Sequence, residues 1–222
     1  MKMDDNRPLA VVFDMDGLMF NTEDVYSEVG SMVLRRRGRE FTPELKAKMM
    51  GLRPQPAFET MIRHCGLSET WDQIAAESNR LFLEILGGLL RPMPGLMELL
   101  DALERAGLPK AVATSSCREL VAACLGSFGL ERRFRFVLTA EDVTCGKPDP
   151  EIYLTAARRL GVEPSRMMVL EDSENGCRAG AAAGAFVVAV PGEHSQWHDF
   201  SNASLSVESL ADPQLHRILG IS

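Results

Sequence analysis

Short apolar runs alternate with longer amphipathic stretches over most of the chain. The apolar runs span four to six residues and end at polar or turn-forming residues, which is typical of buried strands. They cover residues 9–13, 110–114, 134–139, 167–170 and 186–190. The amphipathic stretches have apolar positions at helical spacing and cover residues 95–106, 117–128, 150–160 and 173–183. This alternation predicts βαβ units, and therefore an α/β fold built on a parallel sheet.

Residues 22–91 break this alternation. Helical periodicity appears in residues 25–34, 57–65 and 71–86, and no convincing strand pattern accompanies it. Because this helical block begins directly after the first predicted strand, it is typical of a small domain inserted into a larger one. We therefore assign residues 1–21 and 92–222 to an α/β core, and residues 22–91 to an inserted helical domain.

The composition is that of an ordinary globular protein and limits the classes of partner. Of the 222 residues, 45% are hydrophobic and 25% are charged, which excludes a disordered or collagen-like chain. The formal net charge of −7 disfavours a nucleic-acid surface, because such a surface depends on clustered Lys and Arg. The five cysteines form no C-x-x-C pair and are typical of reduced thiols. Residues 1–7 do not resemble a signal peptide, and no apolar stretch is long enough to span a membrane. We expect a monomeric cytoplasmic protein with no membrane or nucleic-acid partner.

Polar side chains collect where the predicted strands end. In an open parallel sheet, ligands bind outside the carboxyl ends of the strands, so side chains at these ends are candidates for a shared site. Four different strand ends or the loops after them contribute: they carry Asp14 and Asp16, Thr114 and Ser115, Lys147, and Glu171 and Asp172.

The four carboxylates suit phosphoryl transfer supported by a metal ion. Asp14 can attack phosphorus, because a carboxylate forms an acyl phosphate that divides one difficult displacement into two easier ones. Asp16 can protonate the leaving oxygen and later accept a proton from water. Glu171 and Asp172 would complete a Mg²⁺ site opposite Asp14, since Mg²⁺ prefers oxygen ligands. Taken alone, Asp14 and Asp16 could also be solvated loop carboxylates, but the other strand ends favour the catalytic interpretation.

Thr114, Ser115 and Lys147 are the candidate phosphate contacts. Thr114 and the backbone amides of Ser115 and Ser116 come where a strand opens into a helix, and a helix N-terminus binds anions. Lys147 supplies a positive charge to the same oxygens. Capping of the following helix is the simpler function for residues 114–116, and it is compatible with phosphate binding.

These segments together resemble the motifs of the haloacid dehalogenase superfamily. Phe13-Asp14-Met15-Asp16-Gly17-Leu18 resembles its first motif, and Thr114, Lys147 and Leu170-Glu171-Asp172-Ser173 match the other three in order. The helical insertion and the form of the last motif resemble the β-phosphoglucomutase-like and sugar-phosphate phosphatase branch. The resemblance implies a Rossmann-like core, a four-helix-type cap, Mg²⁺, Asp14 as nucleophile and Asp16 as acid/base. It also implies that the backbone carbonyl of Asp16 is a metal ligand.

The inserted domain carries the residues that read the substrate in this branch. Gly51 and Arg53 fall where a glycine and a basic residue approach the substrate in similar enzymes. The mutases of the branch have a lysine in the later cap helix, whereas this chain has Ser78 and Asn79, followed by Arg80. The resemblance therefore implies a phosphatase acting on a small phosphorylated metabolite such as a sugar phosphate. A β-phosphoglucomutase-type phosphoryl transfer is the alternative.

Two further alternatives come from other classes. A phospho-accepting signalling receiver shares an acidic pocket, Thr or Ser and Lys, but it lacks an inserted cap and an acid/base two residues after the phosphorylated Asp. Haloacid dehalogenase activity is disfavoured because Asp16 and the metal carboxylates suit phosphorus. His194 and His198 flank Trp197 at helical spacing, but no Cys or carboxylate pattern completes a zinc site, so we expect a surface loop there.

Overall fold

The computed structural model describes residues 7–49, 52 and 54–221. One parallel sheet organises most of the chain. Its strands lie in the order β3-β2-β1-β4-β5-β6, and every neighbouring pair is parallel. The strands are β1 (Ala10–Phe13), β2 (Lys110–Ala113), β3 (Val137–Leu138), β4 (Met167–Glu171), β5 (Phe186–Ala189) and β6 (Leu205–Ser206). The predicted α/β fold with a parallel sheet is confirmed.

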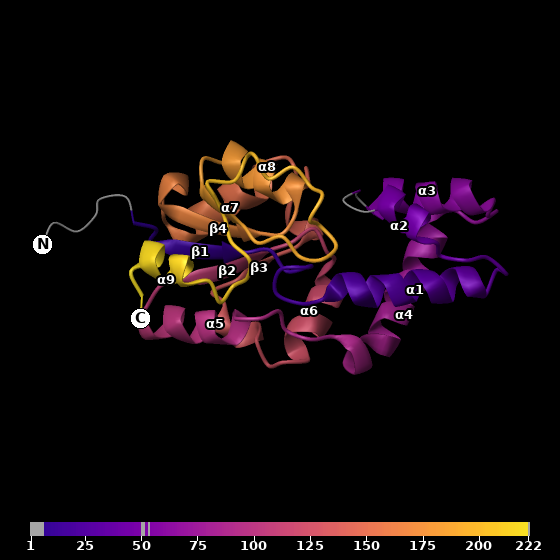
Figure 1. The fold of residues 1–222 in the computed structure, drawn as a ribbon, viewed down its shortest axis with the longest axis horizontal. Helices are drawn as coiled ribbons and strands as arrows, with labels where there is room; N and C mark the ends of the chain where they lie inside the picture. The colour runs from indigo at the N-terminus through magenta and orange to yellow at the C-terminus, as the bar shows by residue number, and fades with distance from the viewer. Residues whose placement is uncertain (1–6, 50–51, 53, 222) are drawn as a thin grey trace, which may run out of the picture. The chain divides into compact units, whose positions relative to one another are not determined.

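Helices cover both faces of this sheet, with α7 and α8 on one side and α5 and α6 on the other (Figure 1). Because neither face meets water, the residues of β1, β2 and β4 are buried throughout, as the near-continuous apolar runs in the sequence require. The helices are α5 (Leu96–Arg105), α6 (Arg118–Gly126), α7 (Glu151–Leu160), α8 (Glu174–Ala182) and α9 (Pro213–Leu219). The short 3₁₀ helices are η1 (Glu131–Arg133), η2 (Ala140–Asp142) and η3 (Pro164–Arg166).

A buried hydrophobic cluster lies between the sheet and the pair α7 and α8. Val12 and Val169 supply apolar surface from the sheet, and Ile152, Ala156 and Cys177 supply it from the helices. The strand register pairs Val12 with Val169, so their side chains are neighbours on the same face. This packing fixes the carboxyl ends of β1 and β4 side by side.

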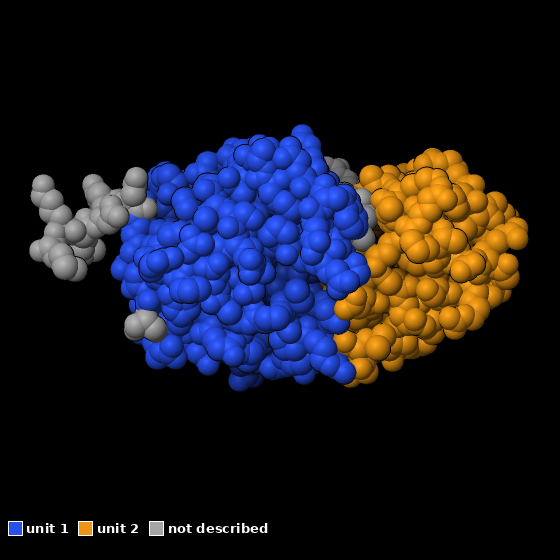
Figure 2. Space-filling model, viewed as in Figure 1, with its two compact units in different colours: residues 1–21, 91–222 blue, residues 22–90 orange. Residues whose placement is uncertain are grey.

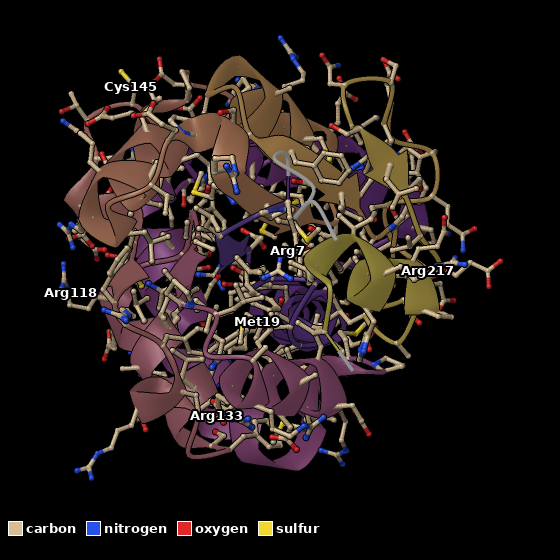
Figure 3. The ribbon with its side chains drawn as sticks, turned by 90° about the vertical axis from the view of Figure 1, so that its left-hand side faces the viewer. Arg7, Met19, Arg118, Arg133, Cys145 and Arg217 are labelled. Atoms are coloured by element: carbon tan, nitrogen blue, oxygen red, sulfur yellow. The ribbon has the colours of Figure 1, made fainter. Side chains whose placement is uncertain are left out.

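Ion pairs stabilise the amino end of β2, where Lys110 lies. Lys110 is buried and its ammonium donates to Glu104 Oε1 at 2.8 Å. Arg133, labelled in Figure 3, donates to both carboxylate oxygens of Glu104. Hydrogen bonds from Arg133 and then from Lys110 lower the pKa of Glu104 to about 2, so the carboxylate stays charged at neutral pH.

The chain divides into two compact units: residues 1–21 with 91–222, and residues 22–90 (Figure 2). The second unit consists of α1 (Thr22–Arg35), α2 (Pro43–Met49), α3 (Pro54–Cys65) and α4 (Trp71–Leu89). Helix α1 packs against α4, where the rings of Tyr26 and Phe82 lie 4.7 Å apart. Arg37, just after α1, donates to Glu69 and Glu77 and joins α1 to the start of α4.

The chain passes between the two units after Asn21 and before Arg91, and these two residues are hydrogen bonded to each other. The amide of Asn21 donates to the carbonyl of Arg91 at 3.1 Å, and the amide of Arg91 donates to Asn21 Oδ1 at 2.6 Å. Phe20 and Pro92 form an isolated antiparallel bridge. No helix in the described ranges combines the length and the apolar character needed to cross a bilayer.

The predicted elements differ from the observed ones mainly in short segments. The third predicted strand, residues 134–139, is reduced to Val137–Leu138. Strand β6 and helix α2 were not expected, because a two-residue strand and a seven-residue, mostly exposed helix leave little periodicity in the sequence.

Gly95 is a point of close backbone contact. It precedes α5 with φ +86°, and a Cβ atom built on it would lie 2.2 Å from the amide nitrogen of Ala211 and 2.5 Å from the carbonyl carbon of Leu210. The segment before α9 therefore packs directly against this glycine, and only a residue without a side chain fits.

We predict that Gly95→Ala lowers the free energy of unfolding by about 3 kcal/mol or more. The change adds about 1–2 kcal/mol of backbone strain to a steric overlap with Ala211. Gly107→Ala is the matched control, because Gly107 has φ +66° but no atom within 4 Å of the place where a Cβ would lie, so only the strain applies. Urea unfolding measures both variants, and equal losses would contradict the close contact.

Candidate active site

Lys147 joins the ends of two neighbouring strands. Its ammonium donates to Asp14 Oδ1 at 2.5 Å, to Glu171 Oε1 at 2.6 Å and to the carbonyl oxygen of Ala113 at 3.0 Å. All three ammonium protons therefore have an acceptor. The register brings these groups together, because Phe13, just before Asp14, pairs with Leu170, just before Glu171. The predicted convergence of Asp14, Lys147 and Glu171 is present in the structure.

The two carboxylates share this one ammonium away from water. Asp14 is 6% exposed, Lys147 is 7% exposed and Glu171 is fully buried. Burial raises the pKa of Asp14 to about 8, despite the opposing effect of Lys147, and the neighbouring Glu171 and Asp16 add to the increase. Burial alone would lower the pKa of Lys147, but Asp14 and Glu171 together outweigh it and raise that pKa well above its usual value, so the lysine keeps its charge. One surplus negative charge therefore has to be balanced by a proton or a cation.

A candidate metal site lies at this same place. One carboxylate oxygen each from Asp14, Glu171 and Asp172 lies within 4.8 Å of the others. A donor set made only of carboxylates suits a hard divalent cation, and a cation would balance the surplus charge. Asp172 approaches the loop after β1 closely, because a Cβ atom on Gly17 would lie 2.3 Å from Asp172 Oδ2. The residues present therefore fit a divalent metal ion.

Glu171 is fixed by donors on both of its oxygens. Tyr153, from α7, donates its hydroxyl proton to Oε1 at 2.6 Å, and Lys147 Nζ lies 5.1 Å from the centre of the Tyr153 ring. Ser173 donates to Oε2 through its hydroxyl at 3.0 Å and its amide at 3.3 Å. The α8 backbone leaves room for this carboxylate only because residue 176 is glycine, since a Cβ there would lie 1.8 Å from Glu171 Cδ.

Sequence reasoning missed Tyr153 as a site residue. A tyrosine on the apolar side of a helix is read as core, and Tyr153 is indeed fully buried. Ser173 could have been recognised from the sequence, because a serine is a preferred N-cap residue and this one directly precedes α8. Its hydroxyl accepts a hydrogen bond from the amide of Gly176.

Asp16 belongs to a second hydrogen-bond system beside the first. Its Oδ2 accepts from the Thr114 hydroxyl at 2.9 Å and from the Ser116 hydroxyl at 2.7 Å. Its Oδ1 is buried and has no hydrogen-bond partner. No other buried side-chain oxygen or nitrogen of the described residues lacks one. The carboxylate is thus held by one oxygen, while the other is left for a group that the chain itself does not supply.

The candidate phosphate contacts have different surroundings. The Thr114 hydroxyl proton goes to Asp16, and the Thr114 oxygen accepts from the amide of Ser116 at 3.1 Å. Thr114 therefore orients Asp16 in this structure, and its contact with phosphate stays a prediction. Ser115 is exposed beside it. A phosphate contact from Lys147 would have to replace one of the three bonds that its ammonium makes.

The predicted substrate residues of the inserted domain, Gly51 and Arg53, lie outside the described residues. Ser78, at the position discussed for the mutases, is buried within α4, and Arg80 on the same helix lies 3.9 Å from Glu84. The assignment of residues 22–91 to a cap also stays a prediction, with the observed boundary between Leu90 and Arg91.

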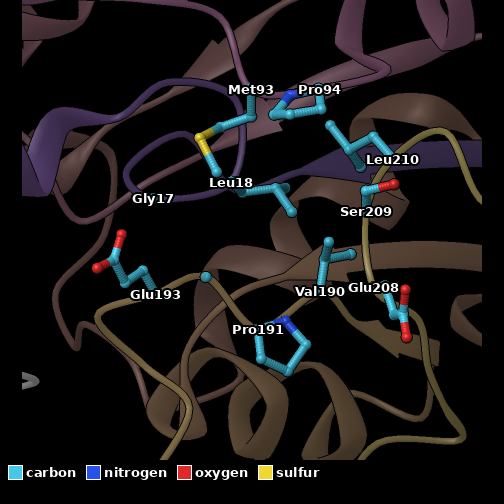
Figure 4. Close-up of a pocket in the computed structure, with 11 residues that line it drawn as sticks. Gly17, Leu18, Met93, Pro94, Val190, Pro191, Glu193, Glu208, Ser209 and Leu210 are labelled. Atoms are coloured by element: carbon cyan, nitrogen blue, oxygen red, sulfur yellow. The ribbon is translucent and has the colours of Figure 1, made fainter.

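A small pocket is lined in part by Gly17, the residue after Asp16. It has a volume of about 180 Å³ and lies between the loops after β1 and β5, with Met93 and Pro94 on another side (Figure 4). Asp14 and Asp16 do not line it, and its lining is mostly apolar apart from Glu193, Glu208 and Ser209. The pocket is therefore adjacent to the candidate catalytic residues and does not contain them.

Comparisons with known proteins agree with this geometry. A family model of haloacid dehalogenase-like hydrolases matches residues 11–190. A probable pseudouridine-5'-phosphatase of Drosophila melanogaster is 36% identical over 90% of this chain and 89% of its own. A phosphorylated carbohydrates phosphatase of Thermotoga maritima is 32% identical over 79% of this chain and 81% of its own. The crystal structure of CbbY from Rhodobacter sphaeroides in complex with phosphate has a TM-score of 0.83 and 26% identity, covering 93% of this chain and 96% of that one.

The chain belongs to the haloacid dehalogenase-like hydrolases, and it is a phosphatase of phosphorylated metabolites. The predicted family and enzyme class are confirmed. A divalent metal is a general requirement of this family, in agreement with the carboxylate cluster.

We predict that the stability of the metal-free protein falls as pH rises from about 5 to about 8. Because the pKa of Asp14 is raised to about 8 in the folded protein, the folded state holds a proton that the unfolded chain releases near pH 4. A divalent metal salt should raise the melting temperature more at pH 8 than at pH 6. Thermal unfolding of the wild type and of Asp14→Asn isolates the effect, since the variant has no carboxyl group there. Identical pH dependences of the two proteins would contradict this assignment.

Proposed function

We propose that this phosphatase is Mg²⁺-dependent and hydrolyses small phosphorylated metabolites, including sugar phosphates, through a phosphoryl group carried by Asp14. The observation that carries the proposal is the pair of differently held carboxylates. Asp14 is bound to Lys147 at the end of β1, and Asp16 is held on one oxygen with the other left without a partner. Two carboxylates in such different surroundings suit two different roles in one reaction.

In the first step, a carboxylate oxygen of Asp14 attacks phosphorus. The bond between phosphorus and the alcohol oxygen of the substrate breaks, and that oxygen takes a proton from Asp16. The buried Oδ1 of Asp16 is the atom that supports this role, because Thr114 and Ser116 occupy only Oδ2. The product alcohol can then leave.

In the second step, water attacks the phosphorus bound to Asp14. Asp16, now deprotonated, accepts a proton from that water, and the bond between phosphorus and Asp14 breaks to release phosphate. Lys147 remains beside Asp14 in both steps and offsets negative charge on the transferring group. The amides of Ser115 and Ser116 are further proposed donors to the phosphate.

The carboxylates of Asp14, Glu171 and Asp172 and the backbone carbonyl of Asp16 are the proposed Mg²⁺ ligands. When bound, the ion supplies positive charge that stabilises the phosphoryl oxygens. The preference for Mg²⁺ rests on the hard oxygen donors and on the family resemblance. Gly51 and Arg53 in residues 22–91, the proposed cap, are proposed to contact the substrate on the strength of that resemblance.

We also propose a cytoplasmic location and a monomeric active form. All five cysteines are free thiols, in keeping with a reducing compartment. Every residue of the proposed site comes from a single chain, so catalysis does not require a second copy.

We predict that Asp14→Asn lowers Mg²⁺-dependent phosphate release at least about a thousandfold with every substrate, because the variant lacks the nucleophile. Asp72→Asn, an exposed carboxylate on α4, is the matched control and should keep normal turnover. Release of phosphate, as opposed to an isomerised sugar phosphate, separates a phosphatase from a mutase. Normal turnover by Asp14→Asn would contradict the proposal.

Asp16→Asn separates the two steps. With p-nitrophenyl phosphate, whose leaving group needs no proton, this variant should release close to one nitrophenolate per protein in a burst and then turn over slowly. The slow phase follows from the loss of the base that activates water. A steady rate equal to that of the wild type, with no burst, would contradict the acid/base role.

A further inference from the structure

The loop after β5 is ordered by its own hydrogen bonds. The amide of Gly192 donates to Ser195 Oγ at 3.0 Å, and the amide of Ser195 donates to the carbonyl of Gly192 at 3.1 Å. The amide of His198 donates to the carbonyl of Ser195 at 3.0 Å. Ser195 is buried, and its hydroxyl and backbone link the two ends of residues 192–198.

The beginning of this loop lies against the loop that carries Asp16. A Cβ atom on Gly192 would be 3.7 Å from the carbonyl oxygen of Gly17, the residue directly after Asp16. A Cβ on Gly17 would in turn lie 2.3 Å from Asp172 Oδ2. Gly192 is therefore a near neighbour of the carboxylate cluster.

The end of the loop is bound to the start of α8. The amide of Glu174 donates to His198 Nδ1 at 3.4 Å, and the amide of Asp199 donates to Glu174 Oε2 at 3.3 Å. Glu174 comes two residues after Asp172. The first residue of 192–198 thus lies against Gly17, and the last is bound to Glu174, two residues along the chain from Asp172.

Trp197 lies between these two attachments and is 61% exposed, the highest value among the large hydrophobic side chains in the described part of the chain. Its ring centre is 5.8 Å from that of His198 in an edge contact, and His198 lies 6.1 Å from Phe200. A single exposed hydrophobic residue needs no explanation on its own. Here, however, an ordered loop fixed beside the reacting groups presents the largest side chain to solvent.

A zinc site at His194 and His198 does not account for this loop. Among the described residues, the side chains that could together hold a metal ion are those of Asp14, Glu171 and Asp172. Neither histidine belongs to this cluster. His198 Nδ1 already accepts a hydrogen bond from Glu174.

We propose that Trp197 is a specificity-determining residue that packs its indole against a ring in the alcohol part of the phosphorylated substrate. This rests on the proposed function, because the phosphate would have to be held at Asp14. The chemistry that the indole recognises is a flat apolar ring face, which a nucleobase offers by stacking and a sugar ring offers through its C–H bonds. An acyclic phosphate ester lacks such a face.

Tryptophan fluorescence tests the contact without catalysis. The chain has two tryptophans, so Trp71→Phe leaves Trp197 as the sole reporter, and Asp14→Asn in the same protein prevents turnover. Uridine 5'-monophosphate or glucose 6-phosphate, with Mg²⁺, should change the emission of Trp197 at saturable concentrations, and inorganic phosphate or glycerol 3-phosphate should not. The difference between the two ring-bearing ligands distinguishes a base from a sugar. Trp197→Phe, which retains Trp71, is the control and should show no such change. An unchanged emission of Trp197 with both ring-bearing ligands would overturn the proposal.

The rates of Trp197→Ala in the otherwise native protein provide the second test. Its kcat/KM should fall about tenfold for the ring-bearing substrate and stay unchanged for glycerol 3-phosphate, whereas the control Trp71→Ala should leave both unchanged. Retained activity on the acyclic ester would leave the proposed phosphatase mechanism intact whatever the outcome for Trp197. Equal losses on all substrates, or no loss on any, would overturn the role of Trp197 in specificity.

Discussion

One buried ammonium holds two buried carboxylates, and the rest of the site depends on it. Lys147 reaches Asp14 and Glu171 from a loop that is distant from both in sequence, and its third proton goes to the end of β2. Buried charges are tolerated only when they are paired and hydrogen bonded, so the sheet register that aligns β1, β2 and β4 is also what makes this arrangement stable. Tyr153 and Ser173 complete it by occupying the other acceptor positions of Glu171.

The surplus charge of this arrangement connects the fold to the chemistry. Glu171 is surrounded by donors, whereas the carboxyl of Asp14 has a pKa raised to about 8 by burial. A cation would make the charged form of Asp14 favourable, and that form is the one that the proposed attack on phosphorus needs. Asp16, two residues away, depends on Thr114 and Ser116 instead of Lys147. The neighbouring strands therefore give two nearby carboxylates separate environments, as the proposed division into a nucleophile and an acid requires.

The parts of the fold that could be predicted from the sequence are those with strong local patterns. The apolar runs of β1, β2, β4 and β5 are near-continuous, and the helices between them have apolar positions at helical spacing. Carboxylates at strand ends predict a site, because an open sheet brings such ends together. Lys147 could be placed through its motif. Two-residue β6 and the exposed helix α2 carry too little periodicity for prediction.

Other parts of the site depend on contacts that only the tertiary structure defines. Tyr153 looks like an ordinary core residue in the sequence, and its hydrogen bond to Glu171 exists only because α7 packs against the end of β4. The same holds for Ser116, whose hydroxyl reaches Asp16 across 100 positions of the chain. The exposure of Trp197 likewise has no local signal, because it depends on the approach of Gly192 to Gly17 and on the hydrogen bond between Glu174 and His198.

The number of protons released when a divalent metal binds is the sharpest test of whether Lys147 leaves one carboxylate charge unbalanced. Calorimetric titration of the metal-free protein with Mg²⁺ at pH 7, in two buffers of different ionisation enthalpy, gives this number. With the pKa of Asp14 at about 8, we expect the release of about one proton per ion at pH 7 and close to none at pH 9.5. Metal binding at pH 7 without proton release would contradict the unbalanced charge.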